Sequence, residues 1–164
     1  MKETTKVNLK DAFAGESQAH VRYAVYADRA EREGLPNIAR LFRAASLSEQ
    51  VHAMNHLKAL GLGVTADHVG IALEGETHEV ETMYPDYMQV AEDDEEKRAF
   101  QAMRDAWEAE KVHMALFGHA RSLGGADVAT VAIFVCPVCG YTMEGEAPER
   151  CPVCNALSSK FITF

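Results

Sequence analysis

The chain has 164 residues, of which 48% are hydrophobic and 25% charged, with a formal net charge of −9. This length suits one domain with a small appendage, and the composition is typical of a soluble globular protein. The acidic charge disfavours nucleic acid and anionic membranes as partners, and no apolar run is long enough to span a bilayer. Because the N-terminal residues lack the apolar stretch of a signal peptide, we expect a cytoplasmic location.

The first 124 residues are predicted to form four amphipathic helices. We expect Asn8 with Asp11 to cap the first helix, and Asp93 with Glu96 to cap the fourth. Pro85 falls inside the third helix and should kink it or loosen one turn. Apolar residues at helical spacing give these ranges: 8–32, 36–60, 68–92 and 94–122.

The remaining residues, 125–164, read as a linker followed by a small metal-stabilised segment. Residues 132–135 are apolar and indicate a first short strand, whereas the rest is rich in Cys, Pro and Gly and too short for its own core. Gly140 and Asn155, which follow the two C-x-x-C pairs, both tolerate the tight left-handed turn that such a pair requires. The pattern predicts a tetrahedral thiolate site, for iron or for structural zinc, at Cys136, Cys139, Cys151 and Cys154.

The helical part contains an internal repeat. Residues 14–17 resemble residues 74–77 at an offset of 60, and Glu49-x-x-His52 matches Glu110-x-x-His113 at an offset of 61. We interpret this as a duplicated helical hairpin.

Acidic residues and histidines interrupt the apolar stripes of all four helices. A buried carboxylate is costly unless it is paired or bound to a metal, and Lys and Arg are scarce on these stripes. All the carboxylates lie on the order of 20–27 Å from their helical corners at 1.5 Å per residue, so they can meet at mid-bundle. Carboxylate oxygen with imidazole nitrogen favours iron or manganese, and five carboxylates suit two ions. The set is Glu16, Glu49, His52, Glu76, Glu79, Glu110 and His113.

The other histidines fit this site less well. His20 and His56 lie on or near the inward face and are interpreted as core or supporting residues. His78 lies two residues after Glu76 and so points elsewhere, and His68 and His119 have the setting of surface residues.

At this point the sequence resembles the rubrerythrins over almost its whole length. The resemblance rests on residues 12–19 (AFAGESQA), the two Glu-x-x-His pairs, residues 75–85 (GETHEVETMYP), and the C-terminal CPVCGY and CPVC segments with Ala147-Pro148 between them. It implies an all-α, ferritin-like four-helix bundle over residues 1–124, followed by a rubredoxin-like metal-stapled domain over 125–164.

The resemblance also implies a di-iron site with Glu49 and Glu110 as bridging ligands. One iron would move between Glu79 and His52 as its oxidation state changes. Tyr23 and Tyr84 would give supporting hydrogen bonds, and the four cysteines would hold a third iron as Fe(Cys)₄, with zinc as a possible substitute. The full implied ligand set is Glu16, Glu49, His52, Glu76, Glu79, Glu110, His113, Cys136, Cys139, Cys151 and Cys154.

The implied activity is that of a peroxidase that reduces hydrogen peroxide to water in oxidative-stress defence. Electrons would come from an NAD(P)H-dependent reductase through rubredoxin and then through the Fe(Cys)₄ centre. Two alternatives stay open at this stage: a ferroxidase or iron-storage protein of the same fold, and a zinc-stapled binding module.

We also expect a homodimer or larger homo-oligomer. The chain beyond His113 suggests that the cysteine domain is tethered at the end of the bundle, remote from its own di-iron site. Electrons would then cross between chains of a head-to-tail pair.

Overall fold

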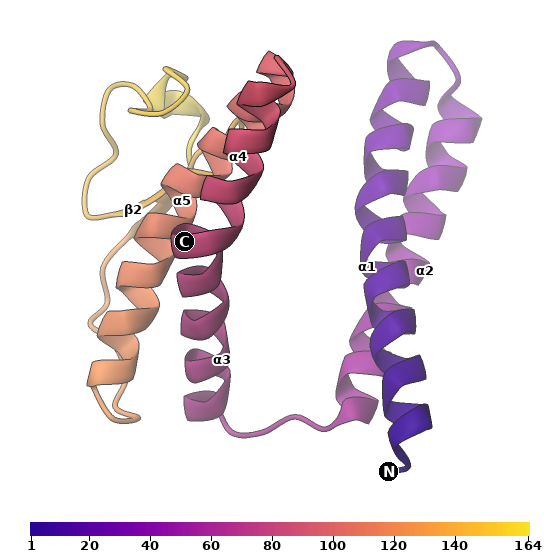
Figure 1. Cartoon of the computed structure of the whole chain (residues 1–164). Helices are drawn as coiled ribbons and strands as arrows, with labels where there is room; N and C mark the ends of the chain where they lie inside the picture. The colour runs from indigo at the N-terminus through magenta and orange to yellow at the C-terminus, as the bar shows by residue number, and fades with distance from the viewer. The chain divides into compact units, whose positions relative to one another are not determined.

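A computed structural model describes all residues, 1–164, and divides them into two compact units, Met1–Gly63 and Val64–Phe164. The first unit is a hairpin of α1 (Glu3–Arg32) and α2 (Pro36–Leu60), drawn in indigo to purple in Figure 1. Gly34 has φ +74°, and the turn is closed by a hydrogen bond from the Leu35 N–H to the Ala30 carbonyl at 2.9 Å. Such a left-handed residue is a common way to end a helix.

Small side chains form the interface of this hairpin. The buried residues are Ala27, Ala30, Ala39, Ser46 and Ala53. Alanine and serine let two helices approach closely, but they bury little apolar area. The larger apolar side chains of the hairpin therefore stay partly or largely exposed within this unit.

The helical part of the second unit is a second hairpin. Its first arm runs through α3 (Thr65–His78), η1 (Glu79–Met83) and α4 (Tyr84–Asp93), and its second arm is α5 (Lys97–Ser122). The backbone N–H of Val64 donates to Asp67 Oδ2 at 3.1 Å, which satisfies one of the free donors at the start of α3. Glu95, with φ +57°, makes the corner before α5.

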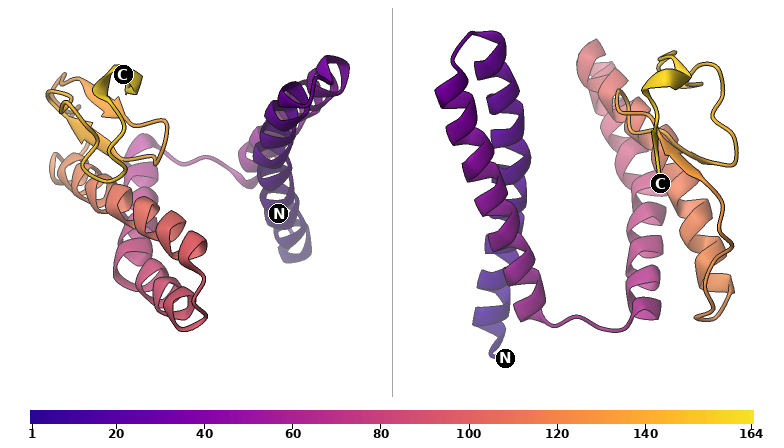
Figure 2. Two further views of the ribbon diagram at one scale, coloured as in Figure 1. Left: turned by 90° about the horizontal axis from the view of Figure 1, so that it is seen from above. Right: turned by 180° about the vertical axis from the view of Figure 1, so that it is seen from behind.

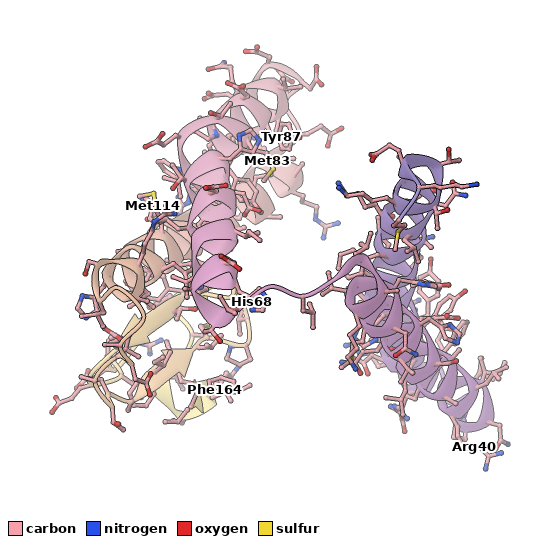
Figure 3. The ribbon with its side chains drawn as sticks, turned by 90° about the horizontal axis from the view of Figure 1, so that it is seen from below. Arg40, His68, Met83, Tyr87, Met114 and Phe164 are labelled. Carbon is pink, nitrogen blue, oxygen red and sulfur yellow. The ribbon has the colours of Figure 1, made fainter.

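The segment η1 is one turn of π-helix inside an otherwise α-helical arm. The Tyr84 N–H donates to the Glu79 carbonyl five residues back, instead of to Val80. Pro85 has no N–H that could donate to the Val80 carbonyl. The Trp107 side chain on α5 satisfies this carbonyl instead, with its Nε1–H donating at 2.9 Å. The loosened turn expected near Pro85 is thus confirmed, and Figure 3 labels Met83 and Tyr87 where the chain leaves it.

The C-terminal residues form a three-stranded antiparallel sheet in the order β2-β1-β3. Its strands are β1 (Ile133–Val135), β2 (Thr142–Glu144) and β3 (Ile162–Thr163), and the short helix η2 (Ser158–Lys160) precedes the last strand. Phe134 pairs with Met143 on one side and with Thr163 on the other. β2 contacts α5, and the views in Figure 2 show the yellow C-terminal segment alongside that helix.

Two details differ from the sequence-based expectations. α1 begins at Glu3 rather than at Asn8, so Asn8 lies inside the helix and caps nothing. Asp93 ends α4, and the N-cap of α5 is Glu96 without a side-chain cap. Glu3 places an acidic side chain in the first turn, where it suits the positive end of the helix dipole, and no proline or glycine precedes Asn8 to stop the helix. The strand expected near 132–135 is confirmed as β1. No helix combines the length and apolarity that crossing a bilayer requires.

Candidate metal centres

The first unit brings together Glu16, Glu49 and His52. One potential ligand atom from each lies within 4.8 Å of the others. His52 Nδ1 is 2.8 Å from Glu49 Oε2 and 4.0 Å from Glu16 Oε1. The His52 side chain is 50% exposed in this hairpin, and its Nε2 has only a distant neighbour, Ser48 Oγ at 3.5 Å.

Two further residues of the first unit, His20 and Tyr23, make contacts between α1 and α2. The His20 Nδ1 lies 2.9 Å from the Ser46 carbonyl, and the Ser46 hydroxyl donates to the His20 carbonyl at 2.8 Å. This pair ties α1 to α2, so His20 has a structural contact between the two helices. Tyr23 packs in a cluster with Tyr26 and Phe42, and the ring centroids of Tyr23 and Phe42 are 5.9 Å apart.

The second unit repeats the arrangement with Glu76, Glu110 and His113. Their ligand atoms also lie within 4.8 Å of one another. His113 Nδ1 is 2.6 Å from Glu110 Oε2 and 3.8 Å from Glu76 Oε2. In both units the Glu-x-x-His spacing puts both side chains on one helix face, as expected for residues three apart.

The carboxylates of the second unit crowd one another. Burial and the neighbouring Glu110 and Glu79 raise the pKa of Glu76 to about 8. Glu76 Oε2 is buried and has no hydrogen-bond partner. A buried, unpartnered carboxylate oxygen facing another acid is unfavourable by itself, and a bound cation removes the conflict. The residues therefore fit the metal that this donor set suggests.

Glu79 and Tyr84 lie beside this cluster on the π-helical arm. Burial, followed by repulsion from Glu110, raises the pKa of Glu79, whereas His78 and His113 act in the opposite direction. Burial and the charges of the same carboxylates, Glu79 first, raise the pKa of Tyr84. Tyr84 therefore keeps its phenolic proton near a group of acids.

A hydrogen-bonded chain joins His113 to the cysteine segment. Thr142, at the start of β2 and only 5% exposed, has its Oγ1 2.8 Å from His113 Nε2. The Thr142 hydroxyl donates to the Gly140 carbonyl at 3.1 Å, so it accepts from the Nε2–H of His113. This arrangement leaves Nδ1, the nitrogen that faces the carboxylates, free to bind a metal.

The four cysteines meet as the sequence predicts. Cys136 Sγ lies 3.5 Å from Cys154 Sγ, and Cys139 Sγ lies 3.6 Å from Cys151 Sγ. Sulfurs 2.3 Å from a tetrahedral metal are about 3.8 Å apart, so the cluster has nearly the right size for one ion. It does not by itself distinguish iron from zinc.

The turns around the cysteines are also as expected. Gly140 (φ +82°) and Asn155 (φ +63°) are left-handed, and each N–H donates to the carbonyl of the first cysteine of its pair at 2.9 Å. Burial acts to raise the pKa of the Cys136 thiol, but N–H groups of Val138 and Cys139 outweigh it and lower the pKa to about 7. Backbone donors thus favour the thiolate that a metal needs.

The expected remoteness of the cysteine domain from its own carboxylate cluster is wrong. The chain after α5 folds back, so that β2 contacts α5 beside His113, well before the end of the helix at Ser122. Sequence reasoning missed Thr142 because a lone threonine in a metal-binding loop has no distinguishing pattern.

Two histidine–carboxylate clusters on helical hairpins and one tetracysteine cluster define a metalloprotein with carboxylate sites and a thiolate site. The Rubrerythrin family model matches residues 7–63 and 61–120, and the model for the rubrerythrin rubredoxin-like domain matches residues 134–162. The chain belongs to the rubrerythrin family. It therefore has that family's fold class, a ferritin-like four-helix bundle with a rubredoxin-like domain.

Individual relatives are similar in sequence to this chain over most of their length. Rubrerythrin-2 of Clostridium acetobutylicum is 38% identical over 173 residues, covering 95% of this chain and 94% of that protein. Nigerythrin of Nitratidesulfovibrio vulgaris is 30% identical over 177 residues, covering 98% and 87%. The structure of fully reduced, all-ferrous nigerythrin matches with a TM-score of 0.56 at 28% identity, covering 100% of this chain and 88% of that one.

Proposed function

We propose that this chain is a peroxidase that reduces hydrogen peroxide to water at a di-iron site, using electrons that pass through its Fe(Cys)₄ centre. The observation that carries the proposal is the bonded path from Gly140 through Thr142 to His113. A one-electron carrier beside a ligand of the carboxylate centre is useful for repeated reduction. Iron storage has no need of such a link.

In this proposal the carboxylate site uses ligands from both hairpins. When bound, the iron pair supplies the two electrons that cleavage of the O–O bond requires. Glu49 and Glu110 would be the ligands shared by the pair, Glu79 and His52 would serve one iron in alternate oxidation states, and Glu16, Glu76 and His113 would complete the ligand set.

The protein's own side chains handle the protons. Reduction of H₂O₂ to two waters consumes two protons with the two electrons. The raised pKa of Tyr84 keeps its hydroxyl protonated beside the carboxylates, so it can donate a hydrogen bond to an oxygen leaving the site. Tyr23 would have the corresponding role on the first hairpin.

The proposed electron source is an NAD(P)H-dependent reductase acting through rubredoxin or directly on the Fe(Cys)₄ centre. The lowered pKa of Cys136 and the surrounding N–H donors favour the thiolate ligands that an iron there would need. A reducing cytoplasm, in which thiols do not form disulfides, suits this site.

The test is an anaerobic assay with NADH, a rubredoxin reductase, rubredoxin and the iron-loaded protein. Hydrogen peroxide should cause NADH oxidation with one NADH consumed per peroxide. The Glu110→Ala variant should lose this activity, whereas Glu74→Gln, which removes an exposed acid from the same hairpin, should keep it. Slow turnover with peroxide, together with the uptake of many irons per chain under oxygen, would favour storage instead.

A further inference from the structure

We propose that Trp107 is a positioning residue for Glu79: its indole N–H holds the π-helical turn η1 against α5 and so sets where the Glu79 carboxylate lies. This inference rests on the proposed function, in which Glu79 is a ligand to one iron. The contact lies entirely within the second unit, Val64–Phe164.

The Val80 carbonyl lies at the point where the helical arm widens. A regular α-helix would pair this carbonyl with the N–H of Tyr84, four residues later. That N–H donates to the Glu79 carbonyl instead, and the following residue, Pro85, has no N–H. A partly buried carbonyl without a donor costs free energy, so the widened turn depends on a donor from outside its own helix.

Trp107 supplies that donor from α5. Its Nε1–H donates to the Val80 carbonyl at 2.9 Å, and its side chain is half-buried. Val80 directly follows Glu79 in the chain. Trp107 lies three residues before Glu110 and therefore on the same face of α5. The bond thus fixes the backbone beside Glu79 relative to the helix that carries Glu110.

This connection acts against repulsion between the two arms. Burial and then the charge of Glu110 raise the pKa of Glu79, so the ionised Glu79 side chain is disfavoured where it lies. Movement of the turn away from α5 would relieve that repulsion. A hydrogen bond at Val80, one residue from Glu79, opposes the movement and keeps the carboxylate beside the other acids.

Contacts within α5 hold the indole in place. Lys111 Nζ lies 4.0 Å from the centroid of the Trp107 ring, and Glu108 Oε2 lies 2.5 Å from Lys111 Nζ. A cation is attracted to the face of an aromatic ring, and the acid three residues earlier keeps the ammonium group near that face. The orientation of the ring therefore does not depend on the bond to Val80 alone.

The first hairpin contains the same connection in a smaller form. The Ser46 hydroxyl donates to the His20 carbonyl at 2.8 Å. Ser46 and Trp107 are 61 positions apart, an offset of the internal repeat. His20 and Val80 are 60 positions apart, the other offset. In each hairpin, a side chain of the second arm thus donates to a backbone carbonyl at the equivalent place on the first arm.

The two hairpins differ in what stands beside this connection. In α1 the helix is regular, and Ala19 occupies the position that corresponds to Glu79. In the second hairpin the turn is widened, the fifth carboxylate is present, and the donor is a large indole instead of a short serine. The larger donor therefore occurs in the half that has a carboxylate to position.

The test uses two substitutions that separate the donor from the packing of the ring. Trp107→Phe keeps an aromatic ring and removes the N–H, whereas Trp107→Gln removes the ring and keeps an N–H donor of similar reach. The readout is the reduction potential of the carboxylate-bound iron, measured by anaerobic redox titration with Mössbauer spectra. Glu79 serves the oxidised state in the proposed function, so a misplaced carboxylate weakens ferric binding relative to ferrous binding.

Trp107→Phe should reduce the preference for ferric iron roughly 10-fold, which raises the potential by about 59 mV for a one-electron step. Trp107→Gln should raise it less, although this variant loses more packing. In a Glu79→Gln background, Trp107→Phe should add no further shift. Ser46→Ala is the matched control: it removes the equivalent bond from the hairpin that has Ala19, and it should leave the potential unchanged.

A purely structural role of the ring predicts the opposite order, with the larger shift in Trp107→Gln. That order, an unshifted potential in Trp107→Phe, or an equal shift with and without Glu79 would overturn the inference. The red absorption of the Fe(Cys)₄ centre counts folded chains, and its own potential is the internal reference. Because the titration contains no peroxide, a protein with the expected shifts that fails to reduce peroxide would refute the proposed function alone.

Discussion

The contact between His113 and Thr142 gives the sharpest single-residue prediction. Thr142→Val keeps the shape of the side chain but removes the oxygen 2.8 Å from His113 Nε2. The Nε2–H is then left without its partner in a place where Thr142 is only 5% exposed. Loss of such a bond costs about 1–3 kcal/mol. Removing the outer partner of a metal-binding histidine lowers metal affinity roughly 10–100-fold, which lies in the same range.

Affinity should be measured by anaerobic competition for Fe(II) between the protein and a chelator. The Fe(Cys)₄ spectrum serves as a check that the C-terminal domain is intact, and Thr142→Ser should restore most of the affinity. Ser48→Ala is the matched control, because Ser48 Oγ lies 3.5 Å from His52 Nε2 and is exposed, so its loss should change affinity less than about threefold. If Thr142→Val binds Fe(II) as tightly as Ser48→Ala does, the Thr142 contact has no role in preparing the site.

Three further predictions concern the second hairpin and the histidine ligands. Because the pKa of Glu76 is raised to about 8, the metal-free protein should lose stability as the pH rises from about 4.5 towards 8, where the unfolded chain has already released this proton. Glu76→Gln should flatten that loss in thermal unfolding at pH 5 and pH 8, and an unchanged slope would show that another group is responsible. His52→Ala should weaken iron binding in the reduced state more than in the oxidised state, as measured by iron retention in each; equal losses would argue against exchange between Glu79 and His52. Trp107→Phe removes the donor to the Val80 carbonyl and should lower the free energy of unfolding by about 1 kcal/mol, as measured by urea unfolding. An unchanged free energy of unfolding would show that this hydrogen bond does not stabilise the π-helical turn.

Much of the architecture was predictable from the sequence. Four apolar stripes set the helices within a few residues, and the two C-x-x-C pairs located the cysteine cluster, because those signals depend on local spacing. Helix starts were less predictable. Asn8 was a reasonable cap by its chemistry, yet no proline or glycine precedes it, so nothing in the neighbouring sequence opposed an earlier start at Glu3.

The site was predictable in composition but less so in arrangement. The spacing of Glu110 and His113 ensures that they share a face, and the structure brings them together with Glu76. The return of β2 to His113 depends on the path of a linker whose residues carry no pattern. The pKa of Glu76 depends on burial between two arms, which spacing along one helix does not reveal.

The π-helical turn lies where the two halves of the chain differ in length. Glu16 and Glu76 are 60 positions apart, but Tyr23 and Tyr84 are 61 apart, as are Glu49 and Glu110. The second half therefore has one more residue between Glu76 and Tyr84 than the first half has between Glu16 and Tyr23, in the stretch where η1 lies.

An extra residue in a regular α-helix would rotate everything after it by about 100° and turn Tyr84 away from the acids. The wider turn absorbs that residue, so Tyr84 stays near Glu76, Glu79 and Glu110. Glu79 begins this turn, where the first half has Ala19 at the corresponding position. The widened turn thus lies where the two halves of the chain differ, with a fifth carboxylate on one side only.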